Sequence, residues 1–317
     1  MLVVTGPTAS GKTDVAIRCA LALGAHVVGA DSRQIYDRLR IGTARPTTEQ
    51  MQGVPHHLVG TVYPACAYSA GAYMRDALAI IEDLHVRNIP IVIAGGAGMY
   101  LGALVDPLPD LPEVPADLRR KLQDEHARHG IAPLLDELAA GDPETFARID
   151  RANPRRVLRA LEILRVTGRS IGEVQRAAAR PSPLHATVVA LDWPRDELYR
   201  RIDARVDAML AEGLLDETRA LLEGGLDPAA LALDTVGYKE ALACLAGRLT
   251  VDQMRALIKQ KTRNYAKRQL TWFRHRLVPT WYAIAHETEL ACVHERIVTD
   301  YTRQEPRIPE PALPRFP

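Results

Sequence analysis

The chain has 317 residues, of which 47% are hydrophobic, and its formal net charge is +1. This length suits one compact domain that carries an insertion, and the near-neutral charge excludes a globally basic nucleic-acid-binding protein, so an RNA partner needs a local patch. The lack of long apolar runs and of a signal-peptide pattern predicts no membrane helix, and four scattered cysteines argue against zinc and disulfides and favour the reducing cytoplasm.

The first elements expected are a buried strand over 2–5, a glycine-rich loop, and a helix from Thr13 to Leu23. The loop matches the P-loop pattern G-x-x-x-x-G-K-T and consists of Gly6, Pro7, Thr8, Ala9, Ser10, Gly11, Lys12 and Thr13. Backbone N–H groups in such a loop cradle a phosphate, the lysine adds charge, and the Thr13 hydroxyl is a Mg²⁺ ligand. The strand before and the helix after disfavour a chance glycine turn, but the loop does not say which phosphate compound it binds.

A second strand is expected over 26–30, and it ends at Asp31, the first residue of D-S-R-Q-I-Y. In P-loop kinases an acid near this place accepts a proton from the acceptor group, whereas an Asp that caps the next segment is the plain alternative. The sequence alone leaves both readings open, although a place across the cleft from the P-loop favours chemistry.

A helix over 70–86 and a third strand over 89–94, closed by Gly95 and Gly96, continue the alternation. Strands that alternate with helices predict an α/β protein whose parallel sheet is covered on both faces, with ligands beyond the carboxyl ends of its strands. The loops over 41–46 and 55–58 were expected to lack regular structure. Arg45 in the first is either an anion contact or an exposed loop arginine, and the adjacent histidines of the second are poor geometry for a metal site.

The middle of the chain predicts a helical insertion. Four prolines between Asp106 and Pro115 indicate a stiff linker, and no strand pattern occurs from there to about residue 179. Strand character returns over 187–192, long helices follow to about 276, and a last strand is expected over 280–284. The expected organisation is a core of 1–106 and 186–290, a helical insertion of 107–185, and a disordered proline-rich tail of 303–317.

A basic stripe is expected on the helix near the C-terminal end, since its cations recur every fourth residue: Arg255, Lys259, Arg263 and Lys267. No acid occurs between Gln253 and Arg276, which favours contact with a phosphate backbone over a solvated face of mixed sign. On this reading, charge removal at Lys259 and Arg263 weakens RNA binding and flattens its salt dependence. The insertion arginines are a second candidate patch, with ordinary surface or ion-paired arginines as the alternative.

Ten segments together resemble one family. In chain order they are GPTASGKT, ADSRQIY, IGTARP, PHHL, YSAGAYMRDAL, IVIAGGAGMY, NPRRVLRALEI, ELYRRIDARVDAML, TVGYKEAL and AKRQLTWFR. In these segments, from about residue 2 to 282, the chain resembles the bacterial tRNA dimethylallyltransferases, also called the MiaA or tRNA isopentenyltransferase family. The P-loop alone is generic, whereas DSRQIY, TVGYKE and AKRQLTWFR in this order are specific.

The resemblance implies a P-loop NTPase/kinase-like core with a mostly helical insertion domain. It also implies a monomeric, cytoplasmic, Mg²⁺-dependent transferase of the dimethylallyl group from dimethylallyl diphosphate to N6 of adenosine 37, beside the tRNA anticodon, with release of diphosphate. The P-loop then holds a leaving group rather than a transferred phosphoryl group, although the family's loop is commonly labelled an ATP site.

Residue roles follow from the same resemblance. Asp31 is expected to take the N6 proton, while Lys12, Thr13 with Mg²⁺, and Arg205 stabilise the departing diphosphate. Contact with tRNA is expected, with Lys259 and Arg263 added from the basic stripe, for Asp31, Ser32, Arg33, Gln34, Arg119, Arg155, Arg156, Val157, Leu158, Arg159, Gly237, Tyr238 and Lys239.

Two departures from the family stand out, Ala97 where a threonine is usual and Asp234 where arginine or glutamine is usual. The main alternative function is a small-molecule P-loop kinase that uses ATP, with Asp31 activating a hydroxyl. A passive nucleotide-dependent RNA-binding module and a transferase acting on free AMP are further alternatives. The helical insertion and the basic stripe argue against the small-molecule kinase and against the transferase acting on free AMP, since neither needs a large contact surface. Asp31 facing an intact P-loop argues against a passive module.

Overall fold

The computed structural model describes residues 1–105, 112–177 and 184–304, which fall into two compact units. One unit contains residues 1–106 and 182–317, and the other contains residues 107–181. Within the described ranges, no helix is long and apolar enough to cross a membrane.

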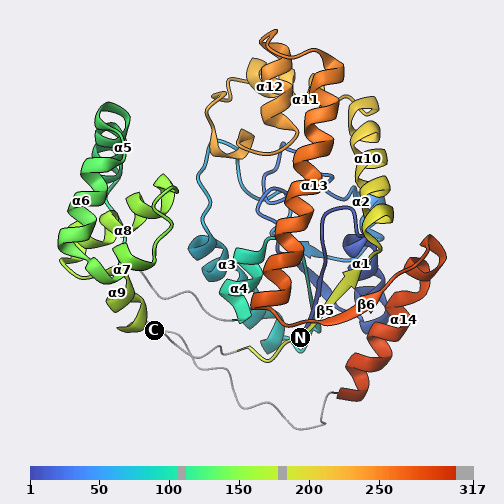
Figure 1. The fold of residues 1–317 in the computed structure, drawn as a ribbon. Helices are drawn as coiled ribbons and strands as arrows, with labels where there is room; N and C mark the ends of the chain where they lie inside the picture. The colour runs from blue at the N-terminus through green and yellow to red at the C-terminus, as the bar shows by residue number, and fades with distance from the viewer. Residues whose placement is uncertain (106–111, 178–183, 305–317) are drawn as a thin grey trace. The chain divides into compact units, whose positions relative to one another are not determined.

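The first unit is built on one parallel sheet (Figure 1). Its strands lie in the order β3-β2-β4-β1-β5-β6, where the bounds are β1 Leu2–Thr5, β2 His26–Gly29, β3 His56–His57, β4 Ile91–Ala94, β5 Thr187–Asp192 and β6 Thr280–Ala283. The central strand β1 pairs in parallel with β4 on one side and β5 on the other, with Val3 opposite Ile93 and Val188. The predicted α/β class and parallel sheet are thereby confirmed.

Helices cover both faces of this sheet because alternate side chains of each buried strand point to opposite faces. Leu2 and Val4 join the apolar cluster of α1 (Lys12–Leu23) and α14 (Glu287–Gln304). Val3 joins the cluster of α3 (Ala70–Val86), α4 (Gly98–Val105) and α13 (Val251–Arg276). Figure 1 shows α14 close beside α1, and α3 close beside α4.

The remaining elements of the first unit complete its helical cover. They are α2 (Thr48–Met51), α10 (Arg195–Ala211), α11 (Leu214–Glu223), the short 3₁₀ helix η1 (Leu231–Leu233) and α12 (Tyr238–Leu245). Helix α10 packs along α13, and α11 and α12 pack on each other.

Two expectations about elements need correction. The segment 55–58, expected to lack regular structure, contains β3, which pairs with β2 through Val27 and Val28; two residues are too few to show a strand pattern. No element was expected over 285–302, where α14 lies and packs on α1. Helix α14 reaches Gln304, so the predicted disordered tail overlaps it at 303–304, and residues 305–317 lie outside the described residues.

The second unit is entirely helical where it is described. Its helices are α5 (Ala116–His129), α6 (Ala132–Gly141), α7 (Pro143–Arg148), α8 (Pro154–Thr167) and α9 (Ile171–Ala177). Helix α8 has a proline in its first turn, a usual start signal, and is capped by Gly168 in the left-handed conformation, a usual stop signal. Its buried Val157, Ala160 and Leu161 pack against Leu122 and Leu138 of α5 and α6.

Gly95 lies where β4 ends, and its substitution is expected to destabilise the sheet. A Cβ on Gly95 would lie 2.0 Å from the carbonyl oxygen of Ala30, a backbone atom that has no rotamer with which to move away. We expect Gly95→Ala to lower the free energy of unfolding, measured with urea, by roughly 1–3 kcal/mol. The matched control is Gly71→Ala in α3, whose Cβ would meet nothing nearer than 3.8 Å; it is expected to raise stability by up to about 1 kcal/mol. Equal stabilities of the two variants would contradict this account of Gly95.

Candidate active site

The P-loop connects β1 to α1 at the carboxyl edge of the sheet. Gly11 has φ +85°, and a Cβ on it would lie 2.6 Å from Cδ2 of Leu290. Glycine suits this position because the backbone is left-handed, and it leaves room for the Leu290 side chain of α14. The helix that follows presents its N-terminal N–H groups to the loop, which makes this end of α1 an anion site.

Side chains from α10 and from the residue after β5 donate hydrogen bonds to backbone carbonyl oxygens of the P-loop. Arg201 Nε donates to the carbonyl oxygen of Ala9 at 2.8 Å, and Trp193 Nε1 donates to that of Ser10 at 3.0 Å. The Arg201 guanidinium lies over the Trp193 ring, 4.4 Å from its centroid, and forms an ion pair with Glu287 of α14. Sequence reasoning missed Arg201 and Trp193, since only their distant partners reveal their role.

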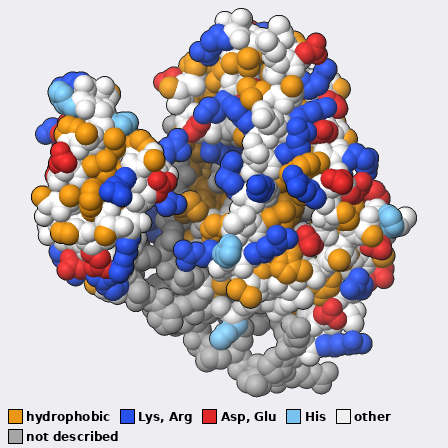
Figure 2. All heavy atoms as spheres, in the orientation of Figure 1, with side chains coloured by type: hydrophobic (Ala, Val, Ile, Leu, Met, Phe, Trp, Pro, Cys, Tyr) orange, Lys and Arg blue, Asp and Glu red, His pale blue; other side chains and the backbone are white. Residues whose placement is uncertain are grey.

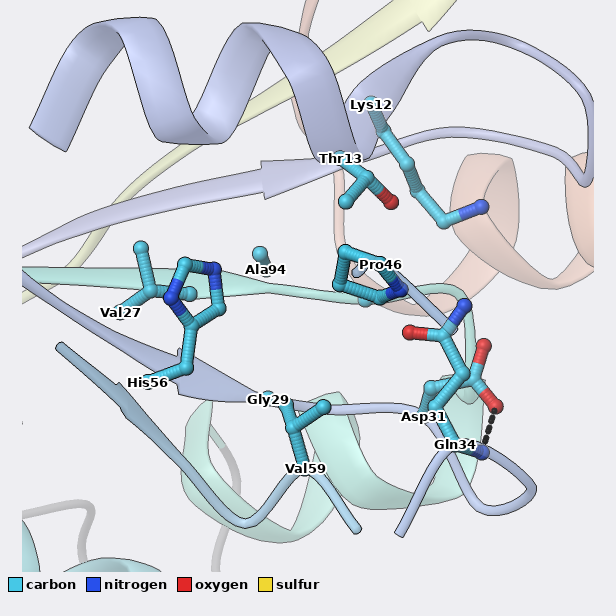
Figure 3. Close-up of a pocket in the computed structure, with 11 residues that line it drawn as sticks. Lys12, Thr13, Val27, Gly29, Asp31, Gln34, Pro46, His56, Val59 and Ala94 are labelled. Carbon is cyan, nitrogen blue, oxygen red and sulfur yellow. Dashed lines mark hydrogen bonds between the residues drawn. The ribbon is translucent and has the colours of Figure 1, made fainter. Parts of the chain in front are cut away.

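Asp31 lies directly after β2, across from Lys12 and Thr13. Its Oδ1 accepts hydrogen bonds from the backbone N–H groups of Arg33 (2.9 Å) and Gln34 (3.3 Å), so the capping alternative is correct for this oxygen. Among the described residues, Oδ2 accepts no hydrogen bond. Figure 3 shows Asp31, Lys12 and Thr13 around one small cavity of about 20 Å³, which therefore has one carboxylate oxygen free for chemistry.

Two half-buried cations, Lys12 and Arg205, accompany this carboxylate. Burial lowers the pKa of Lys12 to about 8; nearby Asp31 opposes this shift, and Arg205 adds to it. Burial also lowers the pKa of Arg205, again opposed by Asp31, although an arginine remains charged at neutral pH. Lys12 Nζ donates to the carbonyl oxygen of Pro7 at 3.3 Å, and Arg205 Nη2 to that of Thr43 at 3.3 Å. The site thus has more buried positive than negative charge, and an anionic ligand would stabilise both cations.

A larger cleft of about 530 Å³ opens beside the P-loop. Lys12, Thr13 and Pro46 line both it and the small cavity, so these residues stand between the two spaces. Its lining includes Arg200, Arg201 and Arg205, and also the acids Asp14 and Glu287, of which Glu287 pairs with Arg201. Its size and charge suit a small molecule with a phosphate group.

The Asp31–Gln34 turn is tied to other segments by side chains that were expected to contact tRNA. Arg33 Nη1 donates to the carbonyl oxygen of Leu231 at 3.1 Å, and Gln34 Nε2 donates to those of Thr43 and Ala44 at 3.1 and 3.0 Å. Ser32 is half-buried beside them. The turn is therefore rigid, which favours a precise position for Asp31.

The T-V-G-Y-K-E segment is mostly core, which corrects the expected tRNA contacts. Gly237 and Tyr238 are buried, and the Tyr238 hydroxyl donates to Glu217 Oε1 at 2.5 Å. Only Lys239 is exposed, and its Nζ lies 2.7 Å from Asp234 Oδ1. The unusual acid at 234 is thus neutralised inside the segment, and Ala97, the other departure, is buried with its N–H donating to the carbonyl oxygen of Ala30.

The tRNA contacts expected in the helical insertion need one correction, which concerns Val157. Val157 is fully buried in the apolar core of the second unit and Leu158 packs against it, so the side chain of Val157 is closed to RNA. Arg119 and Arg159 both pair with Glu162, which is 8% exposed, as the ion-pair alternative expects. Arg155 and Arg156 are exposed at the start of α8.

Arg45 and the two histidines have structural partners. Arg45 Nη1 donates to the carbonyl oxygens of Tyr36 (2.9 Å) and Asp37 (2.5 Å), so the loop arginine fastens its own loop rather than offering a free charge. His56 and His57 lie in β3, and within the described part of the chain no three His, Cys, Asp or Glu side chains are arranged to hold a metal ion.

Three of the four cations of the basic stripe on α13, Arg255, Lys259 and Arg263, are paired with acids, which weakens the reason for assigning them to RNA. Figure 2 shows Lys and Arg side chains along α13 and its neighbour α10. Lys259 Nζ lies 2.7 Å from Asp207 Oδ2, and Arg263 Nη1 lies 2.6 Å from Asp203 Oδ1. Residues 253–276 contain no acid, although Asp252 in the first turn of the same helix pairs with Arg255. Sequence reasoning missed Asp203 and Asp207 because they lie more than fifty residues earlier. Lys259 and Arg263 instead hold α13 against α10.

Cations nearer the end of α13 are better candidates for RNA contact. Lys267 and Arg268 are exposed, and Arg268 lies over the ring of Tyr265, 5.8 Å from its centroid. We expect Lys267→Ala and Arg268→Ala each to reduce the slope of log K against log salt for tRNA binding by about 0.7–0.9. Lys259→Ala is the matched control and should leave the slope unchanged; a flatter slope in this control alone would return the interface to the paired stripe.

The geometry defines a class of protein: a P-loop α/β protein with a buried, cation-rich phosphate site that faces a carboxylate. Comparison with known proteins is more specific. Residues 34–276 match the family model described as IPP transferase, and residues 1–59 match that described as isopentenyl transferase. The chain belongs to the tRNA dimethylallyltransferase family, and it is a prenyltransferase.

Relatives match over most of their length. The tRNA dimethylallyltransferase of Phenylobacterium zucineum is 43% identical, and the match covers 90% of this chain and 93% of that relative. The tRNA dimethylallyltransferase of Thermomicrobium roseum is 41% identical, and the match covers 94% of this chain and 90% of that relative. The crystal structure of the full-length tRNA isopentenylpyrophosphate transferase of Bacillus halodurans is 34% identical over 95% and 97%, with a TM-score of 0.68. A eukaryotic dimethylallyltransferase acting on tRNA is 26% identical over 96% and 80%, with a TM-score of 0.81. The expected P-loop fold and family are confirmed, and the kinase alternative gains no support.

Proposed function

We propose that this protein transfers the dimethylallyl group of dimethylallyl diphosphate to N6 of adenosine 37 in tRNA and releases diphosphate. The observation that carries the proposal is the position of two half-buried cations, Lys12 and Arg205, beside Asp31 at the P-loop. Two cations suit the diphosphate that leaves, and one carboxylate oxygen suits the proton that leaves N6.

The bond changes follow from these groups. The N6 lone pair is delocalised into the adenine ring, so the nucleophile is weak until its proton is accepted. As the N6–C1 bond forms, the C1–O bond breaks, its electron pair goes to the diphosphate, and the N6 proton goes to Asp31. General-base help of this kind contributes about 10²–10⁴ in rate, and preorganised cations stabilise the charge that develops on the leaving group.

The target base has to leave its stack to reach Asp31, at a cost of a few kcal/mol. The rigid Asp31–Gln34 turn and the exposed Lys239, Arg155 and Arg156 offer contacts with the anticodon stem-loop that offset this cost. Arg119, another expected contact, is also exposed and stays in this set.

Mg²⁺ is proposed as the cofactor. The Thr13 hydroxyl lines the same cavity as Asp31 and, among the described residues, has no protein hydrogen-bond partner, which fits a metal that takes one or two protein oxygens and completes its shell with phosphate oxygens and water. When bound, the ion supplies positive charge to the leaving group. We propose further a monomer working in the cytoplasm, which suits the four free cysteines.

The test is a transfer assay with purified protein, Mg²⁺, labelled dimethylallyl diphosphate and unmodified tRNA carrying A36-A37. Label on N6 of adenosine 37 is the expected result. Transfer of phosphate from ATP to a small acceptor, with no label on tRNA, would favour the kinase instead.

A further inference from the structure

Gln269 lies on α13 and is a buried polar side chain with no role so far. It is 6% exposed, and its carboxamide makes two hydrogen bonds of 2.8 Å to backbone atoms more than 170 residues away. Oε1 accepts from the N–H of Thr8 in the P-loop, and Nε2 donates to the carbonyl oxygen of Gly96 after β4. Since one partner is a donor and the other an acceptor, the orientation of the amide is determined.

These two bonds connect the P-loop to the turn that faces it. A Cβ on Gly96 would lie 2.5 Å from Gln269 Nε2, 3.2 Å from Lys12 Cε and 3.4 Å from Lys12 Nζ. The glycine therefore allows both the carboxamide and the end of the Lys12 side chain to pack against one point of backbone. The position of the lysine and the position of the amide are set by the same turn.

Losing this amide leaves two backbone groups without partners, of which the Thr8 N–H is half-buried and the Gly96 carbonyl is buried. The Thr8 N–H and the Gly96 carbonyl then need water or a shift of the backbone, because an unpaired buried polar group is costly. Either change moves the P-loop relative to Gly96, and the support for Lys12 Nζ moves with it. An error of about 1 Å at such a group is enough to weaken a preorganised site.

We propose that Gln269 is a positioning residue for the diphosphate: its amide sets the spacing between the P-loop and the Gly96 turn and so directs Lys12 at the bound phosphates. It touches no reacting atom. The inference rests on the proposed function only for the identity of the anion, since any diphosphate held by the P-loop depends on the same spacing.

The experiment replaces Gln269 with methionine, which has similar volume and makes neither hydrogen bond. Binding of inorganic diphosphate with Mg²⁺ is measured by calorimetry, alongside tRNA affinity, kcat, KM for dimethylallyl diphosphate and melting temperature. We expect diphosphate affinity to fall about tenfold, KM to rise and kcat to fall, with tRNA affinity within twofold of wild type. Gln260→Met, an exposed glutamine of the same helix, is the matched control and should bind diphosphate as wild type does.

A second variant keeps the inference testable if Gln269→Met does not fold. Gln269→Glu keeps the acceptor for Thr8 N–H but places a carboxylate oxygen against the Gly96 carbonyl, so diphosphate affinity is again expected to fall. A lower melting temperature with unchanged diphosphate affinity, in whichever variant folds, would overturn the inference and make Gln269 a packing residue. Wild-type protein that binds diphosphate but does not prenylate tRNA would contradict the proposed function, while the affinity comparison would still judge Gln269.

Discussion

Replacing Asp31 with asparagine is expected to lower kcat for tRNA prenylation by about 10²–10⁴-fold. The amide oxygen of asparagine still accepts from the N–H groups of Arg33 and Gln34, so the turn that Asp31 caps is retained. What is lost is the negative charge and the capacity to accept the N6 proton. Rates measured at saturating dimethylallyl diphosphate and tRNA check this result, and tRNA affinity should stay close to wild type.

Asp31→Ala serves as the comparison because it removes the cap as well as the charge. We expect it to be at least as slow as the asparagine variant and to bind tRNA somewhat less well. Near-normal turnover of Asp31→Asn together with inactivity of Asp31→Ala would show that only the cap matters. The proton would then have to leave N6 by another route, and Asp31 would be a structural residue.

The sheet was predictable because each of its longer strands has a recognisable pattern in its own sequence. Leu2–Thr5 and Thr187–Asp192 are short apolar runs that precede helical patterns, and both are strands within the predicted bounds. Helix α14 was not predicted, and its role depends on Leu290 meeting Gly11, a contact between residues at opposite ends of the chain. Local pattern carries no information about such pairings, so elements whose stability comes from distant partners are the ones that sequence reasoning misses.

In the site, too, the residues in local sequence patterns were predictable, whereas contacts between distant residues were not. Lys12, Thr13 and Asp31 were predicted because the P-loop and the end of β2 are local features of a parallel sheet, and the structure brings them to one cavity. Resemblance added Arg205, which the structure places near Asp31 and Lys12. The ion pairs of Lys259 and Arg263 on α13 were not foreseen because Asp203 and Asp207 belong to another helix. Charge counted along one helix says nothing about the charge it meets.

Lys12→Met is expected to raise the KM for dimethylallyl diphosphate by roughly 10- to 100-fold, since one charge-assisted contact to phosphate is lost, and to lower kcat as well. The pH dependence of dimethylallyl diphosphate binding is a more specific test of Lys12 than the rise in KM. Burial lowers the pKa of Lys12 to about 8 in the free protein, so the ammonium that binds phosphate is present below that pH and disappears above it.

The wild-type affinity for dimethylallyl diphosphate should therefore decline as pH rises from 7 to 9.5, and binding at pH 8–9 should take up a proton, because a bound anion raises the pKa of Lys12 again. Calorimetry in buffers of different ionisation enthalpy measures that uptake. The ligand's own titration is common to both proteins, so the difference between wild type and Lys12→Met isolates the lysine. Identical pH profiles for the two would mean that Lys12 is not the cation that meets the diphosphate, and Arg205 would then be the main contact on the leaving group.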